Sequence, residues 1–68
     1  MSRFNGVKHR VVEKILRDNG WTCIRCAGSH ETWENDGKRI VITAASSGVN
    51  RMVVRRLFRE NGIWPIPT

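Results

Sequence analysis

The feature that most constrains the fold is a tight turn at Asn35-Asp36-Gly37, between two segments of strand-like sequence. Asp-Gly readily adopts the positive φ angles that a short hairpin turn requires. Segment 30–35 before the turn alternates between a polar side that includes His30 and an opposite side that includes Trp33. Segment 38–44 after the turn is apolar on both sides, as expected for a central or half-covered strand. The sequence therefore predicts an antiparallel hairpin with Trp33 in the core and His30 on the open face.

A third strand is predicted over residues 21–26, joined to His30 by the small-residue turn Ala27-Gly28-Ser29. Strict alternation along this strand divides its side chains between two faces. One face would carry Trp21, Cys23 and Arg25, and the other Thr22, Ile24 and Cys26. Such a hairpin can place Arg25 and His30 side by side.

Two helices are predicted to flank the sheet. Apolar residues recur at helical spacing over 7–19, where Asn5 could act as the N-cap, and over 51–61, where Asn50 could act as the N-cap and Gly62 ends the helix. The predicted class is α+β, in the order α-β-β-β-α, with a three-stranded antiparallel sheet and both helices packed on one face.

The whole chain, 1–68, is expected to form one domain, because so short a chain supports a single small core. Residues 1–6 are expected to form a flexible lead and residues 45–49 a loop. The tail, 63–68, contains two prolines that exclude a helix there. Trp64 is expected to fold back onto the core, with docking of a partner as the alternative.

The charge balance points to an anionic partner. Twelve Lys and Arg residues face six Asp and Glu, for a formal net charge of +6, and nine of the twelve are arginines. Arginine suits paired contacts with phosphate, so nucleic acid is the favoured partner and an acidic protein the second. No apolar segment follows the basic N-terminus, so we expect a cytoplasmic protein with no membrane segment.

The segment from Arg25 to His30 has the residue types of a phosphate-binding site. Imidazole gains and loses a proton near neutral pH, and a guanidinium binds phosphate oxygens. Gly28 would let the backbone approach a sugar-phosphate closely, and Ser29 could orient His30 or bind a phosphate oxygen. Lys38 or Arg39 could add positive charge from the next hairpin. No metal or other cofactor is expected.

Other polar residues are assigned weaker or structural roles. His9 is expected at the surface, and Glu31 on the opposite face from His30. Cations on the outer sides of the two helices could contact a nucleic-acid backbone; they are Arg10, Lys14, Arg17, Arg55, Arg56 and Arg59.

Cys23 and Cys26 form a C-x-x-C motif without a second pair of metal ligands. On a regular strand the two thiols would point to opposite faces, so we expect reduced cysteines, with Cys26 buried, and no metal site.

The sequence resembles the HicA-type (YcfA-like) mRNA interferase toxins from His9 to Ile63. The matching features occur in the family's order: Asn19-Gly20-Trp21, Arg25, Gly28-Ser29-His30, Trp33, a D-G-K-R hairpin around Gly37, Leu57 and Asn61-Gly62-Ile63. The resemblance implies a fold similar to a double-stranded-RNA-binding domain, and a metal-free ribonuclease that depends on His30. It also implies a HicB-type antitoxin that covers the active site.

Two further functions stay open on the sequence. The chain could be a non-catalytic module that binds RNA or DNA, with the arginine-rich second helix in a DNA major groove. It could instead be a basic adaptor that docks an acidic protein.

Overall fold

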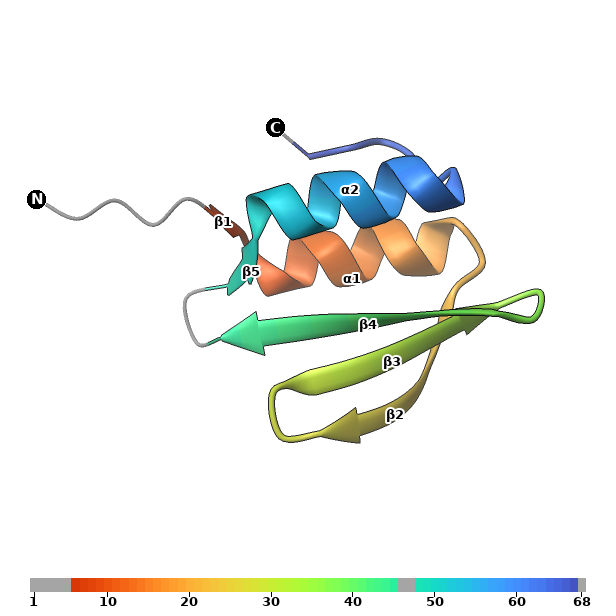
Figure 1. Ribbon diagram of the computed structural model, residues 1–68, viewed down its shortest axis with the longest axis horizontal. Helices are drawn as coiled ribbons and strands as arrows, with labels where there is room; N and C mark the ends of the chain where they lie inside the picture. Colours follow the sequence, from red (N-terminus) through yellow and green to blue (C-terminus); the bar gives the residue numbers. More distant parts are fainter. Residues whose placement is uncertain (1–5, 46–47, 68) are drawn as a thin grey trace, which may run out of the picture.

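The computed structural model describes residues 6–45 and 48–67 as two helices packed on one face of an antiparallel sheet (Figure 1). The elements follow in the order β1 (Gly6–Val7), α1 (His9–Asp18), β2 (Thr22–Ala27), β3 (His30–Asn35), β4 (Lys38–Ala45), β5 (Gly48–Asn50) and α2 (Arg51–Asn61). The α+β class and the helix-covered sheet are therefore confirmed.

The sheet has five strands in the order β1-β5-β4-β3-β2, and the prediction of three strands is wrong. Val7 pairs with Val49 between β1 and β5, and Ala44 pairs with Val49 between β4 and β5. These two added strands are two and three residues long. Segments so short show no measurable alternation, so the sequence pattern predicts a helix for Val7 and a loop for 45–49 instead.

The two hairpins of the sheet have the turn chemistry that their sequences require. Asp36 and Gly37 both have positive φ, 50° and 81°, as a type I′ turn demands, and this predicted turn is confirmed. Gly28 has a φ of 61° at the first central position of the turn between β2 and β3. These turns fix the register: His30 is opposite Thr43 of β4 and Ala27 of β2.

Strand β2 contains a β-bulge at Ile24, between Cys23 and Arg25. Cys23 is opposite Trp33, whereas Arg25 is opposite Thr32, so the two residues occupy different faces of the sheet. The extra residue also places Cys23 and Cys26 on the same face. The predicted assignment of the β2 side chains to the two faces of the sheet is therefore wrong. Simple alternation cannot reveal an inserted residue.

Both helices end close to the predicted positions. In α2, the side chain of Asn50 accepts hydrogen bonds from the backbone N–H groups of Met52 (2.9 Å) and Val53 (3.2 Å), so the predicted cap is confirmed. Gly62 follows in the left-handed conformation. Helix α1 begins later than predicted, after Lys8, because the preceding residues belong to β1. The predicted cap at position 5 lies outside the described residues, as do positions 46 and 47 of the predicted loop.

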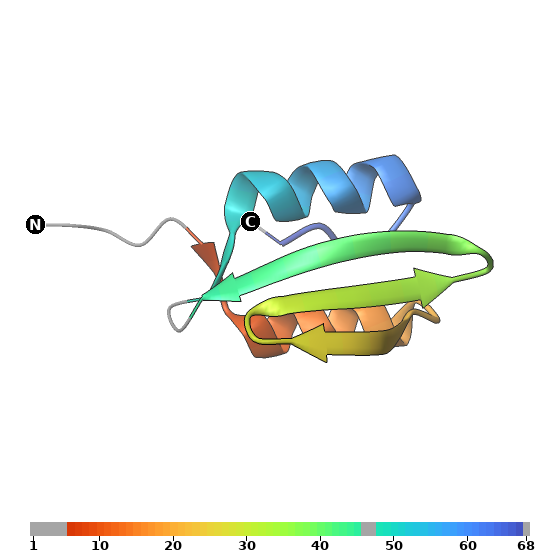
Figure 2. The same ribbon diagram turned by 60° about the horizontal axis from the view of Figure 1, so that its bottom comes forward.

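One hydrophobic core lies between the helices and the sheet. It consists of Val7, Val12, Ile15, Leu16, Trp21, Trp33, Ile40, Ile42, Val49, Val54, Phe58 and Ile63. Trp33 is fully buried at its centre, as predicted, whereas Val41 on the other side of β4 is 52% exposed. The sheet therefore has one covered and one bare face, and Figure 2 shows β2 and β3 in front of α1.

The tail after α2 is anchored to the core, but Trp64 is not part of it. Ile63 is fully buried, and its N–H donates to Phe58 O at 2.8 Å. Ile66 is partly buried and packs against the core. The Trp64 side chain between these two anchors is 63% exposed, so the prediction that it folds back onto the core is wrong.

Candidate functional site

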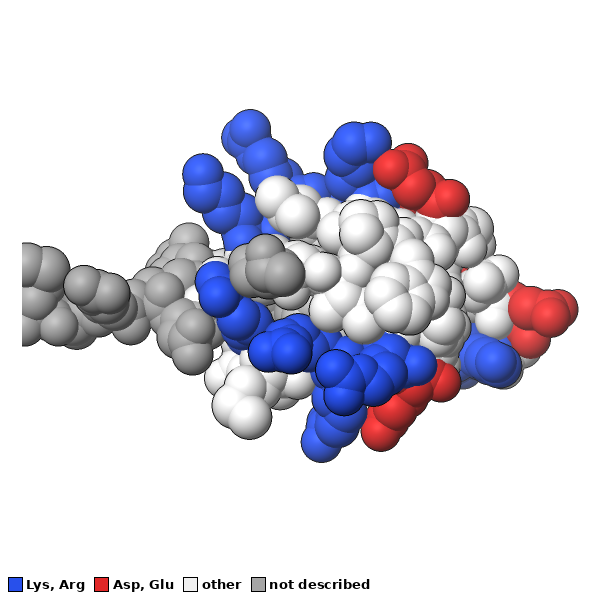
Figure 3. Space-filling view, turned by 90° about the horizontal axis from the view of Figure 1, so that it is seen from above, with Lys and Arg blue, Asp and Glu red and all other residues white. Residues whose placement is uncertain are grey.

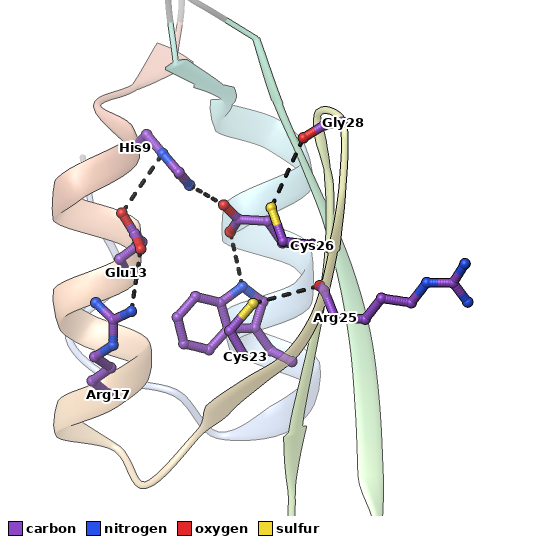
Figure 4. A network of polar contacts seen from close by, with 9 residues as sticks. His9, Glu13, Arg17, Cys23, Arg25, Cys26 and Gly28 are labelled. Carbon is purple, nitrogen blue, oxygen red and sulfur yellow. Dashed lines mark hydrogen bonds and ion pairs between the residues drawn. The ribbon is translucent and has the colours of Figure 1, made fainter.

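The bare face of the sheet carries His30 and Arg25 as close neighbours. His30 begins β3 and lies in a cross-strand row with Ala27 and Thr43. Arg25 lies in the next row, opposite Thr32, so it is the diagonal cross-strand neighbour of His30. The Cα atoms of such diagonal neighbours lie roughly 7–8 Å apart. Both side chains are exposed. The view in Figure 4 shows the Arg25 side chain extending from its strand away from α1.

The turn beside His30 exposes its backbone to an approaching ligand. Gly28 and Ser29 are both exposed, and a Cβ atom added at Gly28 would meet nothing within 4 Å. The carbonyl of Ser29 accepts a 2.8 Å hydrogen bond from the N–H of Ala44, which ties the turn to β4. The turn is thus held in place and accessible.

Lys38 and Arg39 lie at the other end of the β3–β4 hairpin from His30. Arg39 is opposite Glu34 and Lys38 opposite Asn35. Four residues separate His30 from Glu34 along β3, which corresponds to about 13 Å. Arg39 also donates to Glu34 Oε2 at 2.9 Å. The structure therefore brings Arg25 close to His30, and leaves Lys38 and Arg39 at a distance from it.

A polar network lies on the covered side of β3, directly behind His30 (Figure 4). Glu31 is 7% exposed and accepts a 3.0 Å hydrogen bond from the indole N–H of Trp33. Its second oxygen lies 2.6 Å from Nε2 of His9, and Nδ1 of His9 lies 3.6 Å from Glu13. The His9 side chain is 36% exposed, as expected for a residue at the surface, and its imidazole lies between two carboxylates. Glu31 lies on the opposite face from His30, as predicted.

The same network contains the side chains best placed to hold a cation among residues 6–45 and 48–67. Ligand atoms of His9, Glu13 and Glu31 lie within 4.8 Å of one another. The carboxylates already have protein partners, because Glu31 accepts from Trp33 and Glu13 pairs with Arg17 at 3.4 Å. Arg17 also lies 5.3 Å from the centroid of the Trp33 ring. Two contacts of this network join α1 to β3: His9 with Glu31, and Arg17 with the Trp33 ring.

The two cysteines are free and lie on the covered face of the edge strand β2. Cys26 is exposed, and the prediction that it is buried is wrong, because β2 is the edge strand of the sheet. Each thiol donates to a nearby carbonyl: Cys23 to Arg25 at 3.5 Å and Cys26 to Gly28 at 3.9 Å.

Cations also gather over the helices, on the side of the molecule opposite the bare sheet face. Figure 3 shows them along two edges with an uncharged strip between. On α1, Lys14 pairs with Asp18 at 2.9 Å and Arg17 pairs with Glu13. On α2, Arg55, Arg56 and Arg59 are exposed, and no ion pair within the described ranges includes them. Arg10 of α1 is also exposed.

Thr43 belongs to the candidate site and was not identified from the sequence. It is exposed and directly opposite His30. The register of the Asp36-Gly37 turn could have revealed it, since the pairing of Asn35 with Lys38 places position 43 opposite position 30.

These observations define a small basic α+β domain whose bare sheet face presents an imidazole, a guanidinium and an open turn. No helix within residues 6–45 and 48–67 is long and apolar enough to cross a membrane.

Residues 10–63 of this chain match the model of a protein family, the HicA toxin of bacterial toxin–antitoxin systems. The protein therefore belongs to the HicA toxin family. No curated protein and no solved structure matches the chain.

Proposed function

We propose that the protein is a metal-independent endoribonuclease, the mRNA-cleaving toxin of a toxin–antitoxin pair, with His30 as its catalytic residue. The observation that carries the proposal is the exposed His30 on the bare sheet face, with Arg25 as its diagonal neighbour. The membership in a toxin family supports it.

In the proposed reaction His30 takes the proton of an RNA 2′-hydroxyl. The 2′-oxygen then bonds to the adjacent phosphorus and the bond to the 5′-oxygen breaks. The leaving 5′-oxygen takes up a proton from the imidazolium or from water, so the products are a 2′,3′-cyclic phosphate and a 5′-hydroxyl. Arg25 would stabilise the additional negative charge on the phosphorane by charge-assisted hydrogen bonds.

The residues around the pair have supporting roles in this proposal. The exposed Gly28-Ser29 backbone would admit the sugar-phosphate, and the hydroxyl of Thr43, opposite His30, would contact the ribose or the phosphate. Lys38 would contact the RNA backbone away from the cleaved bond. A likeness of the fold to double-stranded-RNA-binding domains, and a HicB-type antitoxin as the partner protein, also belong to this proposal.

The experiment is cleavage of labelled mRNA by the purified full-length protein in the presence of EDTA. The wild-type protein is expected to cleave, and His30→Ala is expected to lower the rate at least about 100-fold, the effect typical of losing a general base. The matched control is His9→Ala, since His9 is the other histidine of the chain and lies on the covered side of the sheet. His9→Ala is expected to retain cleavage per folded molecule.

Thermal unfolding of each variant separates chemistry from folding. A folded His30→Ala protein that cleaves at the wild-type rate would contradict the proposal. So would a wild-type protein that binds RNA without cleaving it, which would favour the non-catalytic binding module.

A further inference from the structure

A groove lies between α2 and the C-terminal tail. Figure 1 shows this tail on the far side of the helices from β3, the strand that His30 begins. We call the groove the tail groove; it is lined by Arg51, Arg55, Arg59, Trp64, Ile66 and Pro67. One wall is therefore a row of cations and the other wall is apolar. The proposed cleavage reaction uses none of these residues.

The cationic wall is regular, and no ion pair within residues 6–45 and 48–67 includes its arginines. Arg51, Arg55 and Arg59 follow one another at four-residue intervals, so their Cα atoms rise about 6 Å from one to the next along the helix. None of the described residues that line the tail groove is acidic, whereas Glu60 lines the neighbouring hollow on α2. Arg51 also donates to Gly6 O at 3.5 Å, which anchors that end of the row. The row matches a polymer with evenly repeated negative charge.

The apolar wall presents one flat aromatic side chain that is accessible to a ligand. The backbone of Trp64 is held by Asn19, whose amide donates to Trp64 O at 2.7 Å and accepts from Trp64 N at 3.2 Å. The indole is nevertheless 63% exposed, while Ile66 and Pro67 beside it are half-buried. A large aromatic side chain that projects into solvent from a fixed backbone is suited to stacking against a planar group.

We propose that the tail groove binds a single-stranded segment of RNA, with its phosphates on the arginine row and a base stacked on Trp64. A nucleic-acid strand combines repeated charge with flat bases, which is the combination that these two walls offer. An acidic peptide would pair with the arginines, but its aliphatic side chains cannot stack on the Trp64 ring as a planar base does. This inference rests on the proposed ribonuclease function. In it, the tail groove binds a part of the RNA substrate that is distant from the cleaved bond.

The test measures binding of a 12-nucleotide oligouridylate to the full-length His30→Ala protein, so that cleavage does not interfere. Trp64→Ala in this background is expected to weaken binding about tenfold, as for the loss of one stacked base. Arg55→Gln is expected to weaken binding and to lower the slope of log Kd against log salt concentration by about 0.7, the value for one phosphate contact with a single strand. The matched control is Arg56→Gln, which removes the same charge from the same helix outside the groove.

Tryptophan fluorescence locates the bound strand independently. Trp21 and Trp33 are 4% and 0% exposed, so acrylamide quenching reports mainly on Trp64. Oligouridylate is expected to protect Trp64 from acrylamide, and Arg55→Gln to reduce that protection. Polyglutamate and an RNA duplex, used as comparison ligands, are expected to leave quenching unchanged.

The outcomes separate this inference from the proposed function. Equal weakening by Arg55→Gln and Arg56→Gln would show that only net charge matters and would overturn the groove assignment. Protection by polyglutamate and not by oligouridylate would also overturn it, in favour of a protein partner. A protein that binds RNA in the groove but never cleaves would contradict only the proposed function. Cleavage that depends on His30, without protection of Trp64, would contradict only the groove.

Discussion

The two histidines of this chain show how position on a sheet decides what a residue can do. His30 lies on the bare face, where its side chain forms no hydrogen bond or ion pair within residues 6–45 and 48–67. His9 lies behind the same strand, between Glu13 and Glu31. Imidazole that is free to meet a substrate can transfer its proton, whereas imidazole between two carboxylates serves mainly to join α1 to β3.

This arrangement predicts a stability difference between two glutamates of β3. Glu31→Ala leaves the buried indole N–H of Trp33 without its acceptor and removes the partner of His9, so we expect a loss of about 1–3 kcal/mol in the free energy of unfolding. The matched control is Glu34→Ala, which breaks an exposed pair with Arg39 and is expected to cost less than about 1 kcal/mol.

Urea denaturation of both variants measures this difference. Equal losses for Glu31→Ala and Glu34→Ala would show that the buried network adds no stability beyond that of a surface ion pair.

At the scale of elements, the sequence was most informative where one residue type is required by backbone geometry. Asp36-Gly37 predicts a hairpin because both turn positions need positive φ. The same turn sets the pairing of β3 with β4, and so determines which residue lies opposite His30. The bulge at Ile24 was not predictable, because an inserted residue leaves a pattern that still looks alternating. The exposure of Trp64 was not predictable either, since hydrophobicity alone does not distinguish a core tryptophan from an exposed one.

The N-cap of α2 gives a prediction at this scale. Asn50→Ala removes the acceptor for two backbone N–H groups and is expected to lower the free energy of unfolding by about 1 kcal/mol. Asn50→Asp keeps a side-chain oxygen and adds a negative charge at the helix N-terminus, so it is expected to preserve stability or raise it slightly. Thermal melts at low salt measure both variants. Equal destabilisation by Ala and Asp would mean that the cap bonds in this structure do not support the helix.

At the scale of the whole molecule, the positive charge is divided between two sides. The cations of α1 are partly neutralised by acidic residues of the same helix, whereas the exposed arginines of α2 have no acidic partner in the described segments. The proposed catalytic pair faces the other way, on the bare side of the sheet. A substrate that uses both sides must therefore pass around the edge of the domain.

The separation of the two sides predicts that cleavage depends on RNA length. A sheet and a helix layer, each about 10 Å thick, lie between the bare face and the tail groove, so a stacked strand needs at least about six nucleotides to reach both. Trp64→Ala and Arg55→Gln are therefore expected to lower kcat/KM for a 20-nucleotide RNA about tenfold and to leave cleavage of a trinucleotide unchanged. The trinucleotide also reports whether each variant keeps an intact catalytic face, because a folding defect would slow both substrates equally. If the groove variants slow the trinucleotide as much as the long RNA, the two sides do not act separately, and the tail groove is not a binding site for the distant part of the strand.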